Sequence, residues 1–358
     1  MANPLHDTLF APHAPREDAF LILPDGGALS HAAFDRLANR IARVLTGAGL
    51  EPGDRVAVQV EKSPEALALY AAAVRAGIVF LPLNTGYTAD ELTYFLENSG
   101  ARLLVCDGAK ADALKPIMDR LGGRTETLDA DGSGSLTKKA RKAEPTFDTV
   151  DRTDDDLAAF LYTSGTTGRS KGAMLTQANL LSNAVTLRDH WRFTDRDVLL
   201  HALPIFHTHG LFVATNVTLA AGGAMIFLPK FDLDRIVALL PEATAMMGVP
   251  TFYTRLLGDD RFDRDLVENM RLFISGSAPL LAETHVRFEE RTGHRILERY
   301  GMTETNMNTS NPYDGERRAG TVGMPLPGVE LKITDPETGD ELPEGEIGQI
   351  GVRGPNGF

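Results

Sequence analysis

Short apolar runs alternate with segments of helical character along most of the chain, and this alternation constrains the fold more than any other feature. The runs occupy residues 55–60, 78–83, 103–106, 158–162, 198–203, 224–228, 245–249 and 272–274. Strands that alternate with helices usually form parallel sheets whose faces are covered by the helices. The sequence therefore predicts an α/β fold.

Several helix ends can be located from the residue types. Ser63 followed by Pro64 is typical of a helix start, with serine as the N-cap and proline in the first turn. Thr88 and Glu91 form a predicted capping box, and Gly100 suits the position just after that helix. Residues 122–156 are rich in Gly, Asp, Lys and Thr with little apolar periodicity, so we expect a surface connection there.

Length and composition exclude several classes of protein. The chain has 358 residues, room for roughly two domains of ~150 residues each. No apolar run approaches the ~20 residues that span a membrane, and residues 1–7 do not resemble a signal peptide, so we expect a cytoplasmic enzyme with no membrane partner. A formal net charge of -13 disfavours nucleic-acid binding. Cys106 is the only cysteine, and its apolar neighbours predict a buried strand position.

Residues 162–172 form a run of glycines and hydroxyl side chains that ends near a lysine. Its glycines are Gly165, Gly168 and Gly172, its hydroxyl residues are Thr163, Ser164, Thr166 and Thr167, and the lysine is Lys171. Backbone amides, hydroxyls and a mobile ammonium group together can hold phosphate groups. The spacing does not fit the Walker A pattern. We predict a phosphate-binding loop, with a flexible linker as the alternative.

Four further segments and this loop together resemble the motifs of one enzyme group. The segments are Tyr70 to Asn84 (YAAAVRAGIVFLPLN), Leu203 to Gly210 (LPIFHTHG), Ile274 to Pro279 (ISGSAP) and Tyr300 to Glu304 (YGMTE). In this order they resemble the adenylate-forming superfamily, which comprises acyl-CoA synthetases, firefly luciferases and the adenylation domains of peptide synthetases. The assignment depends on the whole set, because a single loop would be weak support.

The resemblance implies a particular domain organisation. It predicts two doubly wound α/β subdomains within residues 1–320, and the start of a small β-barrel subdomain within residues 321–358. Residues 329–333 and 346–352, separated by a turn-rich stretch, have the pattern of a hairpin. It also implies that a ribose-binding Thr-Gly-Asp segment, a hinge and a domain with the catalytic lysine lie outside this chain, which we expect to be the N-terminal part of a longer enzyme.

The implied chemistry begins when a carboxylate attacks the α-phosphorus of ATP and displaces pyrophosphate; coenzyme A then takes the acyl group. The resemblance assigns Mg²⁺ to Glu304 and Thr166, and catalytic roles to His207, Thr303, Glu304 and Lys171. It assigns nucleotide binding to Thr163, Ser164, Gly165, Thr166, Thr167, Gly168, Lys171, Gly276, Ser277, Ala278, Glu298, Tyr300, Gly301, Met302 and Thr303. Tyr300 would stack on adenine. A zinc site at the neighbouring histidines is a weaker alternative.

The acyl pocket is where this chain differs from many relatives. Its expected residues are His207, Thr208, His209, Arg255, Ser277, Arg299 and Met302. Many relatives have a small residue before Tyr-Gly-Met-Thr-Glu, whereas this chain has Arg299. An arginine there suits a substrate with a second carboxylate, because its planar fork pairs with that group at two points. This resembles the malonyl-CoA and methylmalonyl-CoA synthetases. Arg299 could instead form a salt bridge with Glu298 or another acidic residue, and Arg255 could be a surface residue.

The sequence thus predicts a ligase that joins malonate or methylmalonate to coenzyme A, with ATP, the short dicarboxylate and coenzyme A as its small-molecule partners; it does not indicate an oligomeric state. Other readings stay open: a ligase for another short carboxylic acid, an amino-acid adenylation domain, or a module that only binds nucleotide. An adenylation domain is disfavoured because no acidic residue occupies a motif position where an ammonium group would need one.

Overall fold

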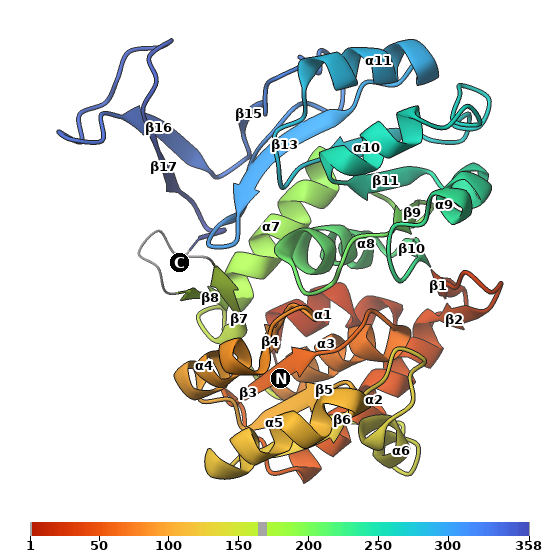
Figure 1. The fold of residues 1–358 in the computed structure, drawn as a ribbon, viewed down its shortest axis with the longest axis vertical. Helices are drawn as coiled ribbons and strands as arrows, with labels where there is room; N and C mark the ends of the chain where they lie inside the picture. The colour runs from red at the N-terminus through yellow and green to blue at the C-terminus, as the bar shows by residue number, and fades with distance from the viewer. Residues whose placement is uncertain (1, 164–169, 358) are drawn as a thin grey trace.

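Two β-sheets, each covered by helices, form the body of the molecule in the computed structural model, which describes residues 2–163 and 170–357 (Figure 1). The smaller sheet has the order β6-β5-β3-β4-β7-β8 and is parallel except for the antiparallel pair β7 and β8. Its strands are β3 (Arg55–Gln59), β4 (Val79–Pro82), β5 (Leu103–Cys106), β6 (Arg124–Thr127), β7 (Leu157–Thr163) and β8 (Lys171–Thr176).

The larger sheet has nine strands in the order β15-β14-β13-β12-β11-β9-β10-β1-β2. The six strands from β13 to β1 are parallel, and the strands at both edges are antiparallel. These strands are β1 (Ala19–Ile22), β2 (Ala28–Ser30), β9 (Val198–His201), β10 (Ala224–Phe227), β11 (Ala245–Gly248), β12 (Leu272–Ser275), β13 (Leu297–Met302), β14 (Asn306–Ser310) and β15 (Met324–Pro325).

Helices fill the space between the sheets and cover their outer faces. The central core joins both sheets with α1 (Pro4–Leu9), α2 (His31–Gly47), α3 (Pro64–Ala76), α6 (Ser135–Ala140), α7 (Gln177–His190), the π-helix η2 (His209–Thr215) and α8 (Asn216–Ala221). The short helix η1 (Ala11–His13) follows α1 and has no buried residue. A second core packs α4 (Ala89–Ser99) and α5 (Gly108–Arg120) on the smaller sheet. A third packs α9 (Leu233–Leu239), η3 (Leu240–Glu242), α10 (Pro250–Leu257) and α11 (Ala282–Thr292) on the larger sheet.

The strands and helix ends that the sequence predicted are present in the structure. All eight predicted apolar runs form strands, and Cys106 is buried in β5, where burial raises the pKa of its thiol to about 11. Ser63 caps α3, Thr88 and Glu91 form the capping box of α4, and Gly100 takes the left-handed conformation with φ 60°. The predicted α/β fold class is confirmed.

The prediction that residues 122–156 form only a surface connection was wrong for residues 124–140. Residues 124–127 form β6, which adds a parallel strand to β5, and Leu128 and Leu136 are fully buried in the central core. An edge strand needs few apolar residues, because it has a neighbouring strand on one side only and is often short and exposed to solvent. The polar composition of this segment therefore concealed a strand.

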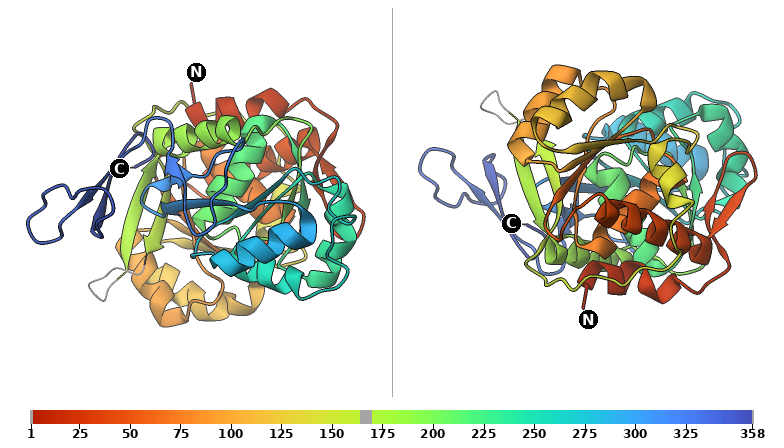
Figure 2. Two further views of the ribbon diagram at one scale, coloured as in Figure 1. Left: turned by 90° about the horizontal axis from the view of Figure 1, so that it is seen from above. Right: turned by 90° about the horizontal axis from the view of Figure 1, so that it is seen from below.

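A hairpin projects from the body near the end of the chain (Figures 1 and 2). It consists of β16 (Glu330–Thr334) and β17 (Gln349–Arg353), which pair antiparallel in a sheet of their own. The predicted hairpin is thus confirmed, although β15 extends the large sheet slightly beyond residue 320. Among the described residues, no helix is both long and apolar enough to cross a membrane.

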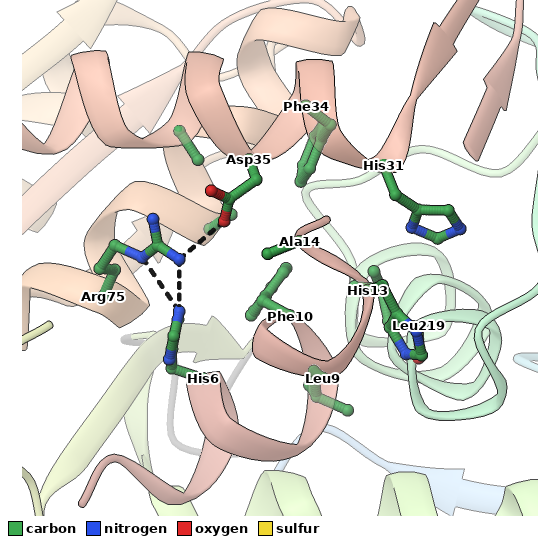
Figure 3. Close-up of a pocket in the computed structure, with 12 residues that line it drawn as sticks. His6, Leu9, Phe10, His13, Ala14, His31, Phe34, Asp35, Arg75 and Leu219 are labelled. Carbon is green, nitrogen blue, oxygen red and sulfur yellow. Dashed lines mark hydrogen bonds and ion pairs between the residues drawn. The ribbon is translucent and has the colours of Figure 1, made fainter. Parts of the chain in front are cut away.

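The N-terminal helix α1 lies against helices of both halves of the molecule. The Asn3 side chain donates a hydrogen bond to the carbonyl of Val74 in α3, and the Leu5 amide donates one to Gln177 of α7. Figure 3 shows the pocket beside α1, where Arg75 donates to His6 Nε2 from Nε at 3.0 Å and from Nη2 at 2.6 Å. The same Nη2 lies 2.7 Å from Asp35 Oδ1. Arg75 thereby fastens the N-terminal segment to the core.

The strand order of the larger sheet determines where a ligand can bind. The chain passes from β9 to β10 on one side and then returns across β9 to β11 on the other. In open parallel sheets, ligands bind at such a reversal, beyond the carboxyl ends of the strands. The loops that follow β9 and β11 are therefore the expected walls of a binding site.

Candidate active site

A pocket of about 410 Å³ lies at the carboxyl ends of β9, β11, β12 and β13. Its walls come from the loops after these strands, the start of η2, β13 and β14: Leu203, Pro204, His207, Thr208, His209, Gly210, Val249, Ser277, Arg299, Gly301, Met302, Thr303 and Met307. Six of the seven predicted acyl-pocket residues thus line one cavity. The exception is Arg255.

Arg299 is the most unusual group in this pocket. The residue is only 4% exposed, and its Nε and Nη2 have no hydrogen-bond partner among the described residues. Burial lowers the pKa of Arg299 to about 9, so the guanidinium is still charged at pH 7. A buried charge without partners costs much free energy, and such groups are normally paired. The arrangement is that of a binding group for an anion.

The turn after β12 is shaped around Arg299. A Cβ added to Gly276 would lie 2.2 Å from Arg299 Cζ, so only glycine leaves room for the guanidinium. The next residue, Ser277, has φ 69°, a backbone conformation that costs a non-glycine residue roughly 1–3 kcal/mol. Its hydroxyl lies 3.1 Å from His209 Nδ1. Strain at a pocket wall is typical of functional sites.

The loop from residue 203 to residue 210 brings three polar side chains to the pocket. His207 is exposed in it, and partial desolvation lowers the pKa of the His207 imidazole. Thr208 and His209 are buried, and Thr208 Oγ1 and His209 Nε2 lack partners within the described part of the chain. Burial, followed by the charge of Arg299, lowers the pKa of His209, so His209 is neutral at pH 7.

The motif residues Thr303 and Glu304 lie between this pocket and the end of β7. Thr303 lines the large pocket and also a smaller one, which it shares with His207 and with residues of β4 and β7. The Thr163 hydroxyl donates a hydrogen bond of 3.2 Å to Glu304 Oε1. The start of the glycine-rich run and the predicted magnesium ligand therefore lie together, and their oxygens are of the hard type that Mg²⁺ prefers.

Most of the predicted phosphate loop lies outside the described residues. This holds for Ser164, Gly165, Thr166, Thr167 and Gly168, and so for the proposed Thr166 contact to magnesium. Lys171 is exposed at the start of β8, and the Tyr94 hydroxyl donates a hydrogen bond of 2.9 Å to the carbonyl of Ser170. The nucleotide roles of these residues, and of Gly276, Ala278, Tyr300, Gly301 and Met302, stay predictions.

Two expected residues point elsewhere. Arg255 is exposed on α10, with its guanidinium 4.2 Å from the centre of the Phe231 ring, so the expectation that it lines the acyl pocket was wrong. The Glu298 side chain is buried 3.2 Å from His285 Nδ1 of α11, on the face of β13 opposite Arg299. Glu298 therefore neither pairs with Arg299 nor lines the pocket; a nucleotide contact through its side chain has no support here.

Several pocket residues had no signal in the sequence. Pro204, Val249 and Met307 line the cavity, but an apolar or proline residue near a strand end is also what any loop or core position would contain. The position of Val249 directly after β11 could have indicated it, because strand ends of parallel sheets bind ligands. Met307 lies on the antiparallel strand β14, which that rule does not cover.

The chain belongs to the AMP-binding enzyme family, whose model matches residues 10–358. The chain is 58% identical to MatB from Rhodopseudomonas palustris, with a TM-score of 0.97 over 100% of this chain and 71% of that one. A benzoate CoA ligase from Burkholderia xenovorans is 26% identical, with a TM-score of 0.89 over 100% of this chain and 72% of the ligase.

Curated relatives include malonate–CoA ligases. The enzyme from Arabidopsis thaliana is 32% identical over 95% of this chain and 62% of its own length. The mitochondrial enzyme from Mus musculus is 36% identical over 72% of this chain and 46% of its own length. The chain thus spans less than two thirds of these relatives.

Proposed function

We propose that the protein activates malonate or methylmalonate with ATP and transfers the acyl group to coenzyme A. The observation that carries this proposal is the buried guanidinium of Arg299 in the large pocket, two of whose nitrogens have no hydrogen-bond partner among the described residues. A monocarboxylate would have its single anionic group at the reacting end and would leave this charge unpaired. The second carboxylate of a short dicarboxylic acid would pair with Arg299 at two points.

The relatives support the same substrate class. The Arabidopsis and mouse proteins are named malonate–CoA ligases, and MatB from Rhodopseudomonas palustris was crystallised with ATP bound. The reaction consistent with them has two steps. A carboxylate oxygen of the acid attacks the α-phosphorus of ATP and pyrophosphate leaves; the coenzyme A sulfur, after losing its proton, then attacks the acyl carbon and AMP leaves.

The side chains near the pocket suit distinct parts of this reaction. Arg299 would hold the distal carboxylate, while His207 and Thr303, which line both pockets, would face the reacting carboxylate and the phosphate. Glu304, with the Thr163 hydroxyl beside it, would hold Mg²⁺, which supplies positive charge to the phosphate oxygens. We also propose that the protein is located in the cytoplasm. Residues 321–358 would form the start of a separate subdomain.

An ATP–pyrophosphate exchange assay with a panel of acids tests this function in the full-length protein. We expect the highest kcat/KM with malonate or methylmalonate, and lower values with acetate, propionate and amino acids. A preference for a monocarboxylate would favour another short-acid ligase, and a preference for an amino acid would favour an adenylation domain. Binding of ATP without exchange for any acid would leave only a nucleotide-binding module.

A further inference from the structure

Lys62 is a buried lysine that connects the two sheets. It follows β3 of the smaller sheet and is 7% exposed. Its Nζ lies 2.8 Å from His201 Nδ1, 2.8 Å from the His201 carbonyl oxygen and 3.0 Å from the Leu203 carbonyl oxygen, all at the end of β9 in the larger sheet. The Phe227 ring centre lies 4.2 Å away. Among the described residues, these acceptors are a histidine nitrogen and two backbone carbonyls, and none of them is a carboxylate.

The surroundings of Lys62 match the needs of an ammonium group. Its three N–H groups face three acceptors, and an aromatic face adds a favourable contact with a cation. Burial lowers the pKa of Lys62, and these acceptors oppose that effect by stabilising the charged form. A lysine held in this way constrains the backbone of Leu203 as well as the ring of His201.

His201 extends the connection to a second point of the chain. Its Nε2 lies 2.9 Å from the Gly210 carbonyl oxygen and 3.2 Å from Thr215 Oγ1. Because Nδ1 accepts from Lys62, Nε2 carries the hydrogen and donates it to Gly210. Burial and the charge of Lys62 lower the pKa of His201, which keeps the ring neutral in this role.

The Leu203 carbonyl, which accepts from Lys62, and the Gly210 carbonyl, which accepts from His201, lie at the two ends of the loop that carries the pocket histidines. These ends come close together, since a Cβ added to Gly210 would lie 2.0 Å from the Pro204 carbonyl oxygen. Between them, His207, Thr208 and His209 face the pocket. The position of this loop relative to Arg299 therefore depends on contacts at its ends, outside the pocket itself.

We propose that Lys62 is a positioning residue for the acyl pocket: its ammonium group, directly and through His201, holds both ends of the loop 203–210 and so sets where His207 and His209 lie relative to Arg299. Lys62 does not line the pocket. The kinetic test of this inference rests on the proposed function, because only that function assigns malonate binding to this pocket. It also explains why a buried lysine joins the carboxyl ends of β3 and β9, the two places where the strand order reverses.

The test compares Lys62→Met with Arg75→Met in the full-length protein. Both variants remove a buried cation near an end of α3, but Arg75 contacts His6 and Asp35 away from the active site. For Lys62→Met we expect kcat/KM for malonate to fall about 10- to 100-fold through a higher KM, because a small displacement of positioning groups is costly. The KM for ATP should change less than twofold. Arg75→Met should leave both KM values near wild type.

Amide hydrogen exchange supplies a readout that needs no activity. Lys62→Met should speed exchange at Leu211, whose amide donates to the His207 carbonyl, more than it speeds exchange at the core amides of β9, whereas Arg75→Met should affect these amides alike through its lower stability. If the wild-type protein shows no acid-dependent pyrophosphate exchange, the proposed function fails. Amide hydrogen exchange at Leu211 still tests the role of Lys62 in that case. Unchanged exchange at Leu211, or equal rises in both KM values, would overturn the inference.

A second substitution covers the case in which Lys62→Met does not fold. Lys62→Gln keeps two N–H donors near the His201 and Leu203 carbonyls, so its malonate KM should rise above the wild-type value but less than that of Lys62→Met. If Lys62→Met is unfolded, the rise of the Lys62→Gln KM above wild type is the expected result. A folded Lys62→Gln protein with wild-type kinetics and wild-type exchange at Leu211 would show that the contact does not position the loop.

Discussion

Two buried arginines in this molecule have opposite surroundings. Arg75, beside the N-terminal helix, donates to His6 and forms an ion pair with Asp35, so its charge is compensated by the protein (Figure 3). Arg299, in the large pocket, has two nitrogens without partners among the described residues. A buried charge with protein partners supports the fold, whereas one without them is an unfilled binding group. The comparison indicates which cation a substrate should meet.

The largest expected effect comes from removing the compensated charge. Arg75→Met leaves Asp35 without its buried partner and His6 without its donor, and breaking such a pair costs roughly 3–5 kcal/mol. We expect the free energy of unfolding to fall by that amount, with the KM for malonate unchanged, in urea denaturation and kinetic assays. A loss below ~1 kcal/mol would show that the Arg75 contacts contribute little to stability. Arg75 and Arg299 would then not differ in their effect on the fold.

The opposite result is expected for Arg299. Arg299→Met removes a charge that the folded protein does not compensate, so stability should stay the same or rise. Malonate, however, would lose the partner of its second carboxylate, a loss of roughly 2–5 kcal/mol, or about 30-fold to several thousand-fold in kcat/KM. Propionate should lose far less. An equal fall for the two acids would assign Arg299 to the architecture of the site, and the dicarboxylate proposal would lose its main support.

The region around Arg75 should also respond to acid, because it contains three histidines held neutral. Burial, with added repulsion from nearby arginines, lowers the pKa of His6 and His13 and lowers that of His31 to about 4. The unfolded chain takes up these protons near pH 6.5, so stability should be full above pH 6.5 and decline as the pH falls toward 4. For His31 the loss is about 3 kcal/mol at most.

Urea denaturation at pH 7, 5.5 and 4.5 measures this effect. His31 packs 4.8 Å from the Phe20 ring, so His31→Phe should keep the packing and reduce the decline between pH 6.5 and 4. The same decline in the variant would mean that other groups cause the acid sensitivity.

The smallest expected effect concerns the strained turn beside Arg299. In Ser277→Gly, the glycine can adopt φ 69° without the steric strain that a Cβ causes there. The free energy of unfolding should therefore rise by about 1 kcal/mol. The variant also loses the contact with His209, and we expect a modest increase in KM for malonate. Lower stability in calorimetry would show that the Ser277 hydroxyl contributes more than the strain costs.

Much of the fold could be predicted because it depends on local chemistry. The capping box at Thr88 and the left-handed Gly100 use interactions between residues close in sequence, and the apolar runs of both sheets are long enough to be seen directly. The strand β6 was missed because residues 124–127, Arg-Thr-Glu-Thr, carry no apolar side chain. Its formation depends on an available edge of β5, which no local pattern reports.

The sequence by itself determined the alternation of strands and helices, the order of the motifs, and the presence of an arginine before Tyr-Gly-Met-Thr-Glu. Only the tertiary structure decided which side chains meet: Arg299 faces the pocket while its neighbour Glu298 turns to His285, and Arg255 lies on the surface against Phe231. It also brought Lys62 to His201, 139 positions away. The reason is physical, since residue type sets what a group can bind, whereas strand alternation and strand order set what lies within reach.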